Sequence, residues 1–341
     1  MIARNVAATV FASSALAAFS ACSAPASNAI PTRWTMLPAG VTEPAKRGKI
    51  KIYTDTFGDP VPQGIAVGPD GALWFTDSGN DVIGRMTTRG DFTMQVSPGD
   101  EVSDGITAGP DGALWFTTYN HIGRITTGGS VTLFPNAGGT LPHGITTGPD
   151  GALWFAESDG NVGRITTEGS ITHFPVAPAN AALQSIVTGP DGNLWVTQYI
   201  VGGSRLSNQV IRLTTGGQSK SFTVGIGPDG LCVGPDGALW FTEAGTGALG
   251  RLTVNGKYKE YSIAYRYNQP SGIAAGPDRA LWFTDFSGRA GIGRMTVSGK
   301  MKFYGAGTHY SELDQIISGP GGAMWFSSSF GPSAIGRIAT H

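Results

Sequence analysis

A motif that recurs seven times predicts one all-β domain, a single seven-bladed β-propeller with four antiparallel strands in each blade. The consensus is Gly-Pro-Asp-Gly-x-Leu-Trp-Phe-Thr, and successive copies begin 39 to 45 residues apart, which is the spacing of propeller blades. Seven of the eight tryptophans occupy one position of this motif. The copies begin at Gly68, Gly109, Gly148, Gly189, Gly234, Gly276 and Gly319.

The third copy shows the four strands that are expected in each blade. Residues 144–147 are expected to form the inner strand, 152–156 the tryptophan strand, 162–166 the third strand and 170–174 the outer strand. Glycine turns separate them, because glycine readily adopts a positive φ. Apolar runs such as Leu-Trp-Phe are typical of sheets covered on both faces, so the tryptophan is expected to pack between blades. The arginine of the downstream Ile-Gly-Arg is expected to bond backbone or the turn aspartate of a neighbouring blade.

The two ends of the repeat region are expected to complete one blade together. The last copy ends with its third strand, a few residues before His341. The segment 49–53 precedes the first copy and alternates between polar and apolar residues. We expect it to pair with the last blade and to close the ring, which leaves no strand edge free. The propeller then spans residues 49–341, and we expect a monomer.

The composition agrees with such a scaffold and excludes several other classes of protein. Glycine accounts for 52 of 341 residues and charged residues for 14%, against a usual ~25%. The sequence lacks the Gly-X-Y period of collagen, and a content of 40% hydrophobic residues argues against disorder. A net charge of −1 without a basic cluster indicates no nucleic-acid partner. Cys232 lies in an apolar segment, where an inert thiol and no disulfide are expected.

Residues 1–27 are expected to be an export signal, and residues 28–48 a linker. The apolar run over 6–19 is too short for a comfortable membrane span and is followed by small residues. Phe-Ser-Ala-Cys, ending at Cys22, resembles a bacterial lipobox and predicts lipidation of Cys22. The alternative is plain signal-peptidase cleavage two to four residues later. Both predict an exported bacterial protein, periplasmic or anchored to a membrane through the lipid alone.

Functional residues are expected where the copies differ, on one shared rim of the ring. The Pro-Asp-Gly turns mark the opposite, uniform rim. Two varied positions are expected to crowd a central funnel and to form a polar, net acidic binding site. The first, just before the inner strand, holds Gln63, Asp104, His143, Gln184, Asp229, Ser271 and Asp314. The second, at the end of the tryptophan strand, holds Asp77, Thr118, Glu157, Gln198, Glu243, Asp285 and Ser328.

The titratable residues of this rim allow two interpretations. The carboxylates either cap strand ends and bond backbone amides, or some of them bind a divalent cation, since Mg²⁺ and Ca²⁺ prefer oxygen ligands. His121, His143 and Glu157 come from adjacent blades and could form an acid–base group, because imidazole titrates near neutral pH. The alternative is that they are polar rim residues without a catalytic role.

The repeated Pro-x-Gly-Ile, Gly-Pro-Asp-Gly-x-Leu-Trp-Phe-Thr-Glu and Ile-Gly-Arg-Ile-Thr resemble the streptogramin B lyases, the virginiamycin B lyase family, over residues 49–341. The resemblance implies an enzyme that opens cyclic depsipeptides without water. A base removes a proton, the carbon–oxygen bond breaks by elimination, and Mg²⁺ assists.

The resemblance also implies positions for the site residues. It places catalytic histidines where this chain has Ser271 and Asp314, and a second glutamate where it has Ser329. Glu312 matches the family and is the expected metal ligand or acid. A tyrosine that contacts substrate in the family aligns with Gln63.

Three functions therefore stay open for the varied rim, each with a small molecule or peptide as ligand. The first is a carbon–oxygen lyase acting on a cyclic ester, with His143 as base, Glu157 or Glu312 as acid or Mg²⁺ ligand, and His121 nearby. The second is a non-catalytic periplasmic binding or scaffold propeller. The third is a lactone hydrolase with an axial Ca²⁺. The expected substrate-binding residues are Gln63, Asp104, Tyr119, Asp229, Glu243, Ser271 and Asp314.

Overall fold

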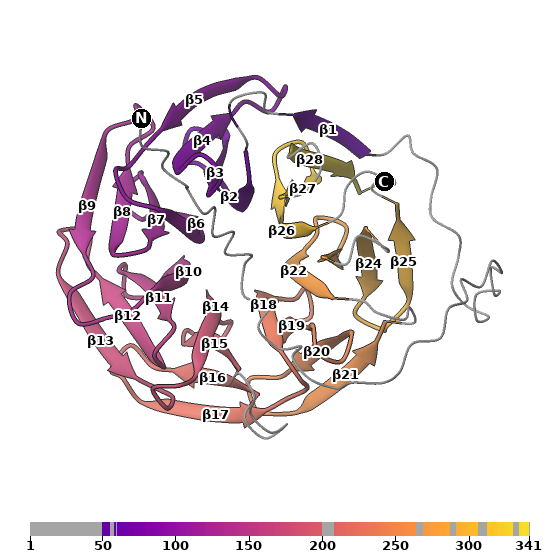
Figure 1. Ribbon diagram of the computed structural model, residues 1–341. Helices are drawn as coiled ribbons and strands as arrows, with labels where there is room; N and C mark the ends of the chain where they lie inside the picture. The colour runs from indigo at the N-terminus through magenta and orange to yellow at the C-terminus, as the bar shows by residue number, and fades with distance from the viewer. Residues whose placement is uncertain are drawn as a thin grey trace, which may run out of the picture. The chain divides into compact units, whose positions relative to one another are not determined.

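The computed structural model describes residues 50–54, 58, 60–199, 208–263, 269–286, 291–305, 312–329 and 334–340. Within these ranges, 28 strands form seven four-stranded antiparallel sheets. The sheets follow one another around a central axis in chain order (Figure 1). The predicted seven-bladed propeller is therefore confirmed. The predicted export signal, the linker and Cys22 lie outside the described residues.

Each of the first six blades runs from an inner strand at the axis to an outer strand at the periphery (Figure 1).

No helix in the described part of the chain is long and apolar enough to cross a membrane. In chain order the strands are β1 (Ile50–Thr54), β2 (Pro62–Val67), β3 (Leu73–Asp77), β4 (Val82–Met86), β5 (Phe92–Val96), β6 (Val102–Ala108), β7 (Leu114–Thr118), β8 (His121–Ile125), β9 (Val131–Pro135), β10 (Pro142–Thr147), β11 (Leu153–Glu157), β12 (Asn161–Ile165), β13 (Ile171–Pro175), β14 (Ala182–Thr188), β15 (Leu194–Tyr199), β16 (Gln209–Leu213), β17 (Ser219–Thr223), β18 (Pro228–Val233), β19 (Leu239–Glu243), β20 (Ala248–Leu252), β21 (Tyr258–Ser262), β22 (Pro270–Ala275), β23 (Ala280–Asp285), β24 (Ile292–Thr296), β25 (Met301–Tyr304), β26 (Leu313–Gly319), β27 (Ala323–Ser328) and β28 (Ala334–Ala339).

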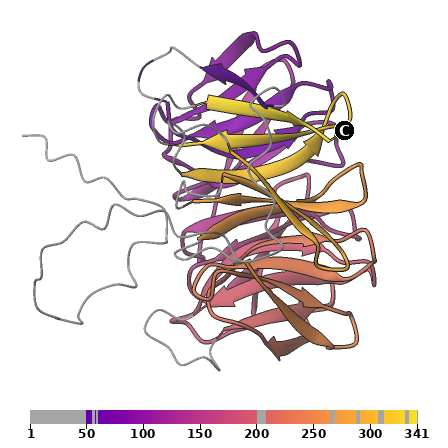
Figure 2. The same cartoon turned by 90° about the vertical axis from the view of Figure 1, so that its right-hand side faces the viewer.

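The seventh blade joins the two ends of the repeat region, as the sequence predicts. Its strand order is β1-β28-β27-β26, and β1 pairs antiparallel with β28 from Ile50↔Ile338 to Thr54↔Ala334. The indigo β1 lies beside the yellow C-terminal strands in both views (Figures 1 and 2). Tyr53 also stacks on the tryptophan of this blade, Trp325, with ring centroids 5.8 Å apart.

The repeated tryptophans are fully buried between blades, which confirms their predicted structural role. Trp154 of the third blade belongs to one apolar cluster with Leu183 and Ile186 of the fourth. Its indole Nε1 donates to Asp150 Oδ1 in the uniform turn, at 2.9 Å. Packing and the indole hydrogen bond together fix the orientation of the ring.

The repeated arginine binds the turn aspartate of its own blade. Arg164 Nε donates to Asp150 Oδ2 at 2.7 Å, and five other blades hold an equivalent pair. The prediction of a neighbouring blade's aspartate was wrong. Arg164 lies opposite Trp154 in the β11–β12 pairing, so both side chains reach the turn that precedes their own tryptophan strand.

All seven inner strands depart from regular pairing at the varied position. In the third blade Pro142 pairs with Glu157 and Ile145 with Phe155, so His143 and Gly144 form a bulge. A bulge redirects the side chain that it carries. In the second blade Gly105 follows the varied residue, and a Cβ there would collide with the carbonyl of His143 in the next blade. Glycine thus allows the inner strands to approach closely.

Candidate functional site

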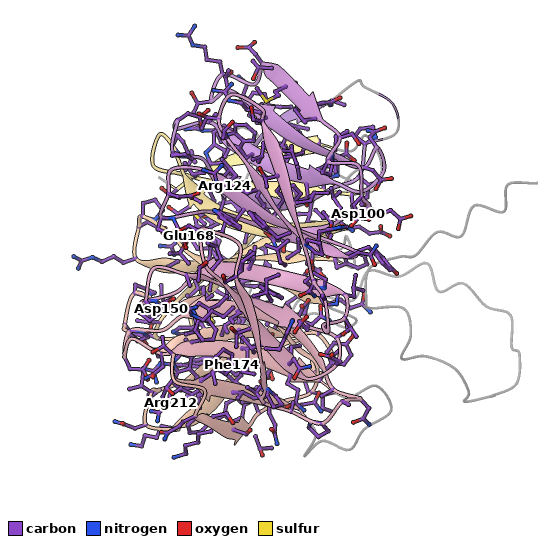
Figure 3. All side chains as sticks on the ribbon, turned by 90° about the vertical axis from the view of Figure 1, so that its left-hand side faces the viewer. Asp100, Arg124, Asp150, Glu168, Phe174 and Arg212 are labelled. Atoms are coloured by element: carbon purple, nitrogen blue, oxygen red, sulfur yellow. The ribbon has the colours of Figure 1, made fainter. Side chains whose placement is uncertain are left out.

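The varied loops and the uniform turns lie at opposite ends of the ring. Figure 3 shows Asp100, in the loop that leads into β6, at one end of the propeller. Asp150 of a uniform turn and Glu168 lie at the other end in the same view. The sequence prediction of a varied rim opposite a uniform rim therefore holds for these residues.

Four varied residues, Asp104, His143, Asp229 and Asp314, form what we call the axial cluster. They lie in the inner strands β6, β10, β18 and β26. His143 Nδ1 is 3.6 Å from Asp104 Oδ1, and His143 Nε2 shares a 2.8 Å hydrogen bond with Ser158 Oγ. The cluster thus joins residues that are far apart in the sequence.

A glutamine bridge shows how tightly the inner strands meet. Gln315 of the seventh blade accepts a hydrogen bond from the Ile65 amide of the first blade, at 3.2 Å. Its Nε2 donates to the carbonyl of Asp104 in the second blade, at 3.5 Å. One side chain therefore spans three blades beside the axial cluster.

The charges of Asp104 and His143 stabilise each other. Burial disfavours the carboxylate of Asp104, but the imidazolium of His143, 3.6 Å away, holds its pKa below the usual value. Burial likewise disfavours the imidazolium, but Asp104, with a further contribution from Asp229, raises the pKa of His143. The Asp104 side chain is 38% exposed and that of His143 13%, so a ligand can reach the pair.

The other two aspartates are pushed toward their neutral forms. Burial, then the charge of Asp104, raises the pKa of Asp229 to about 7. Burial, together with the charges of Glu312, Asp104 and Asp229, raises the pKa of Asp314 to about 7. Near neutral pH the axial cluster therefore combines an ionised carboxylate with carboxyls that can still donate a proton. Titratable groups whose pKa values are driven apart in this way are typical of functional sites.

The second varied position turns away from the axis where it carries a glutamate. Glu157 is fully buried and accepts hydrogen bonds from Asn136 Nδ2 and from His173 Nδ1 of β13, both at 2.8 Å. Glu243 accepts from the Tyr258 hydroxyl of β21, at 2.7 Å, and burial raises its pKa to about 7. Both carboxylates bind the outer strand of their own blade, and Glu243 also accepts from the Gly225 amide at 3.0 Å, as the capping interpretation expects.

The three residues expected to form one acid–base group have separate partners. His121 Nδ1 lies 2.7 Å from Asp100 Oδ2, whereas His143 contacts Asp104 and Glu157 contacts β13. Tyr119, an expected substrate contact, is 44% exposed. Of the three, the structure assigns only His143 to the axial cluster.

The positions implied by the family resemblance carry mainly backbone contacts. Ser271 takes the place of His143 in the sixth blade, and its carbonyl accepts from Thr242 Oγ1 at 2.7 Å. The carbonyl of Gln63 accepts from Ser327 Oγ. Glu312 adopts a positive φ of 69°, and burial raises its pKa.

The donor set for magnesium is incomplete at these positions. Mg²⁺ takes near-octahedral oxygen coordination. Glu312 matches the family, but Ser329 replaces the second glutamate, and its amide donates to the Glu312 carbonyl at 3.1 Å. Among the described residues, no group of three or more histidines, cysteines, aspartates and glutamates is arranged to hold a metal ion. The residues present therefore do not fit the metal site that the resemblance implies.

Two residues of the site, Ser158 and Tyr199, were not identified from the sequence. Ser158 directly follows the tryptophan strand β11, and Tyr199 is the last residue of β15, so each comes directly after the second varied position. Burial and the charge of Asp229 raise the pKa of Tyr199. The sequence offers no signal for Ser158, because its place beside the His143 bulge follows from the pairing of Pro142 with Glu157. Cys232, by contrast, behaves as expected, since burial raises the pKa of its thiol to about 12.

Comparison with known proteins gives consistent results for the ring. The model of the virginiamycin B lyase family matches residues 40–207 and 203–341. A catalytically inactive histidine-to-alanine variant of virginiamycin B lyase from Staphylococcus aureus, with quinupristin, superimposes with a TM-score of 0.77 at 29% identity, covering 86% of this chain and 99% of that one. A streptogramin B lyase structure gives 0.73 at 26% identity, covering 85% and 96%.

A more distant structure shares the fold alone. The hydrazine synthase structure from Kuenenia stuttgartiensis superimposes with a TM-score of 0.70 at 16% identity, covering 87% of this chain and 99% of that one. Comparison with curated protein sequences gives no match.

Proposed function

Since the chain belongs to the virginiamycin B lyase family, we propose that it binds a small molecule or peptide at the axial cluster and acts on it as a carbon–oxygen lyase. The observation that supports this most is the pair formed by His143 and Asp104 at the inner ends of two adjacent blades. The proposed substrate class is a cyclic ester or depsipeptide, by analogy with the quinupristin complex of the relative.

The chemistry proposed for the axial cluster is an elimination with two proton transfers, one from the substrate carbon and one to the departing oxygen. His143, oriented by Asp104, takes the proton next to a carbonyl group in its neutral form, which becomes more populated as the pH rises through its raised pKa. As the carbon–oxygen bond breaks, the departing oxygen receives a proton from Asp229, whose pKa of about 7 leaves it partly protonated at neutral pH. No water is consumed, and the ring-opened product is an isomer of the substrate.

A non-catalytic binding propeller is the second candidate. The observation that favours it is that Ser271 and Asp314 stand where the resemblance places catalytic histidines. In that case the axial cluster would bind ligands through its net negative charge, which favours neutral or cationic groups.

The test is to incubate the full chain with quinupristin and to separate substrate from product by chromatography and mass spectrometry. The lyase predicts a ring-opened isomer of unchanged mass, lost in His143→Ala and reduced in Asp104→Asn. Asp91→Asn, which removes one exposed carboxylate from a β4–β5 turn, is the control. Binding in calorimetry without any product supports the second candidate, and neither binding nor product contradicts both.

We also propose that residues 1–27 direct export, that Cys22 carries a lipid anchor in a bacterial membrane, and that the exported ring is a monomer. The support is the lipobox resemblance described above and the pairing of β1 with β28, which gives the seventh blade four strands like the others. Labelled palmitate should enter the wild-type chain but not Cys22→Ser. Absence of label from both chains would contradict the lipid anchor and favour plain signal-peptidase cleavage, with release into the periplasm.

A further inference from the structure

A hydroxyl, an imidazole and a carboxylate stand in series in the third blade. His143 Nε2 hydrogen-bonds Ser158 Oγ at 2.8 Å, while the other ring nitrogen, Nδ1, faces Asp104 Oδ1 at 3.6 Å. In this order the carboxylate orients the imidazole, and the imidazole can take the proton of the hydroxyl. Such a series is recognised by the geometry and roles of its members, whatever fold carries it.

The fold brings the three side chains together by two local features. Strands β10 and β11 pair with Pro142 opposite Glu157, so Ser158 follows at the end of the hairpin. The bulge in β10 redirects His143, and the corresponding bulge in β6 of the adjacent blade carries Asp104.

The first blade shows what is specific to the third. Ser78 occupies the place of Ser158 there, and its Oγ donates to the Val61 carbonyl at 3.4 Å. Ser158 Oγ also lies 3.4 Å from the Leu141 carbonyl, but its 2.8 Å contact with His143 Nε2 is much the shorter. The serine and its backbone contact are therefore features of the repeat. Only the third blade adds a histidine at the first varied position.

We propose that Ser158 is an activated nucleophile that hydrolyses carboxylic esters through an acyl-enzyme. Ser158 Oγ attacks the ester carbonyl carbon as its proton passes to His143 Nε2. The carbon–oxygen bond to the alcohol breaks, and the alcohol leaves with the proton from His143. Water, deprotonated by His143, then attacks the acyl-enzyme, which releases the acid and restores the Ser158 hydroxyl.

The substrate class is a neutral or cationic ester, cyclic esters included, because the carboxylates of the axial cluster repel anions. The inference shares His143 with the proposed lyase but does not depend on it. Elimination yields an isomer of the substrate, whereas hydrolysis yields a product heavier by one water molecule. The two activities therefore fail or succeed separately.

The test is covalent labelling of the full chain with a fluorophosphonate, followed by peptide mapping, together with hydrolysis of p-nitrophenyl butyrate. The wild type should carry the phosphonate on Ser158, and Ser158→Ala should carry none there. His143→Ala should label and hydrolyse about 100-fold more slowly or worse, and Asp104→Asn should lie between. Ser78→Ala, which removes the equivalent hydroxyl without a histidine beside it, should match the wild type.

Folding of each variant is checked by circular dichroism and thermal melting. A folded wild type without an adduct on Ser158 overturns the inference. Labelling of Ser158 that is equally fast in His143→Ala overturns it as well, because the hydroxyl would then not be activated by the imidazole. With quinupristin, a water-containing product lost in Ser158→Ala supports the inference, and an isomeric product retained in Ser158→Ala supports the lyase alone.

Discussion

Replacing Asp229 by asparagine should stabilise the propeller at alkaline pH and leave it unchanged in acid. Burial and the charge of Asp104 raise the pKa of Asp229 from its usual 3.8 to about 7 in the folded chain. Between these values the unfolded chain releases a proton that the folded chain retains, so folding stability falls as pH rises from about 4 to 7. Asparagine has nearly the same shape and no proton to lose, so it removes this pH-dependent cost.

The magnitude follows from the two pKa values. At 1.36 kcal/mol for each pH unit, the difference between 3.8 and about 7 corresponds to at most about 4 kcal/mol. Asp229 is partly exposed, and asparagine also forfeits the attraction between Asp229 and His143. We therefore expect a gain of about 2 kcal/mol at pH 8, which for a domain of about 290 residues raises the Tm by roughly 3 °C.

The assay is the Tm of wild type and Asp229→Asn from pH 4 to 8.5, by circular dichroism at constant ionic strength. Asp150→Asn is the matched control with the opposite sign. Burial disfavours the charge of Asp150, but hydrogen bonds from Trp154 and Arg164 hold its pKa below the usual value. This variant should therefore be less stable than wild type at neutral pH, and the deficit should shrink in acid. A Tm difference for Asp229→Asn that is independent of pH would refute the reasoning.

Two further predictions concern the scaffold. A Cβ on Gly163 would collide with the Phe155 ring, whereas the fourth blade has Ile211 opposite Val196 at the equivalent pair. Gly163→Ile should therefore lower the free energy of unfolding by at least 1–3 kcal/mol. Adding Phe155→Val to the same chain should recover part of this loss in a double-mutant cycle of urea unfolding. Equal losses in single and double variants would speak against this pairing. Deleting residues 49–54 should lower the Tm sharply, because β28 loses the partner that closes the ring; an unchanged Tm would contradict closure.

The fold could be predicted because the blades repeat the same local signals. The tryptophan and the downstream arginine recur in all seven copies, and in the first six the turn aspartate binds both side chains. In the seventh copy Gly321 replaces the aspartate, and Trp325 Nε1 donates to the Pro320 carbonyl instead. The one misplaced contact is instructive. The sequence shows that Arg164 and Asp150 recur together, but the β11–β12 register decides that they belong to one blade.

The sequence predicts which rim of the ring carries the candidate site, but not all of the side-chain contacts within it. The repeat places Asp104 and His143 at equivalent positions of adjacent blades, so their proximity follows from the ring. The contact between His143 and Ser158 depends on a bulge, which the sequence does not mark. Glu157 lies one residue before Ser158, yet its carboxylate turns to Asn136 and to the outer strand. Which way such neighbours turn is decided by the donors that tertiary packing supplies.

The same residue type has opposite energetic effects at the two ends of the ring, and this argues for a function at the axis. Hydrogen bonds to Trp154 and Arg164 favour the charged form of Asp150, so this aspartate supports the fold at neutral pH. Burial and like charge disfavour the charged form of Asp229, so this one opposes it. A neutral side chain meets the structural demand at that position, since Gln63, Gln184 and Ser271 occupy it in three other blades. Ionisable groups that cost stability where a neutral residue suffices are expected where binding or catalysis requires them.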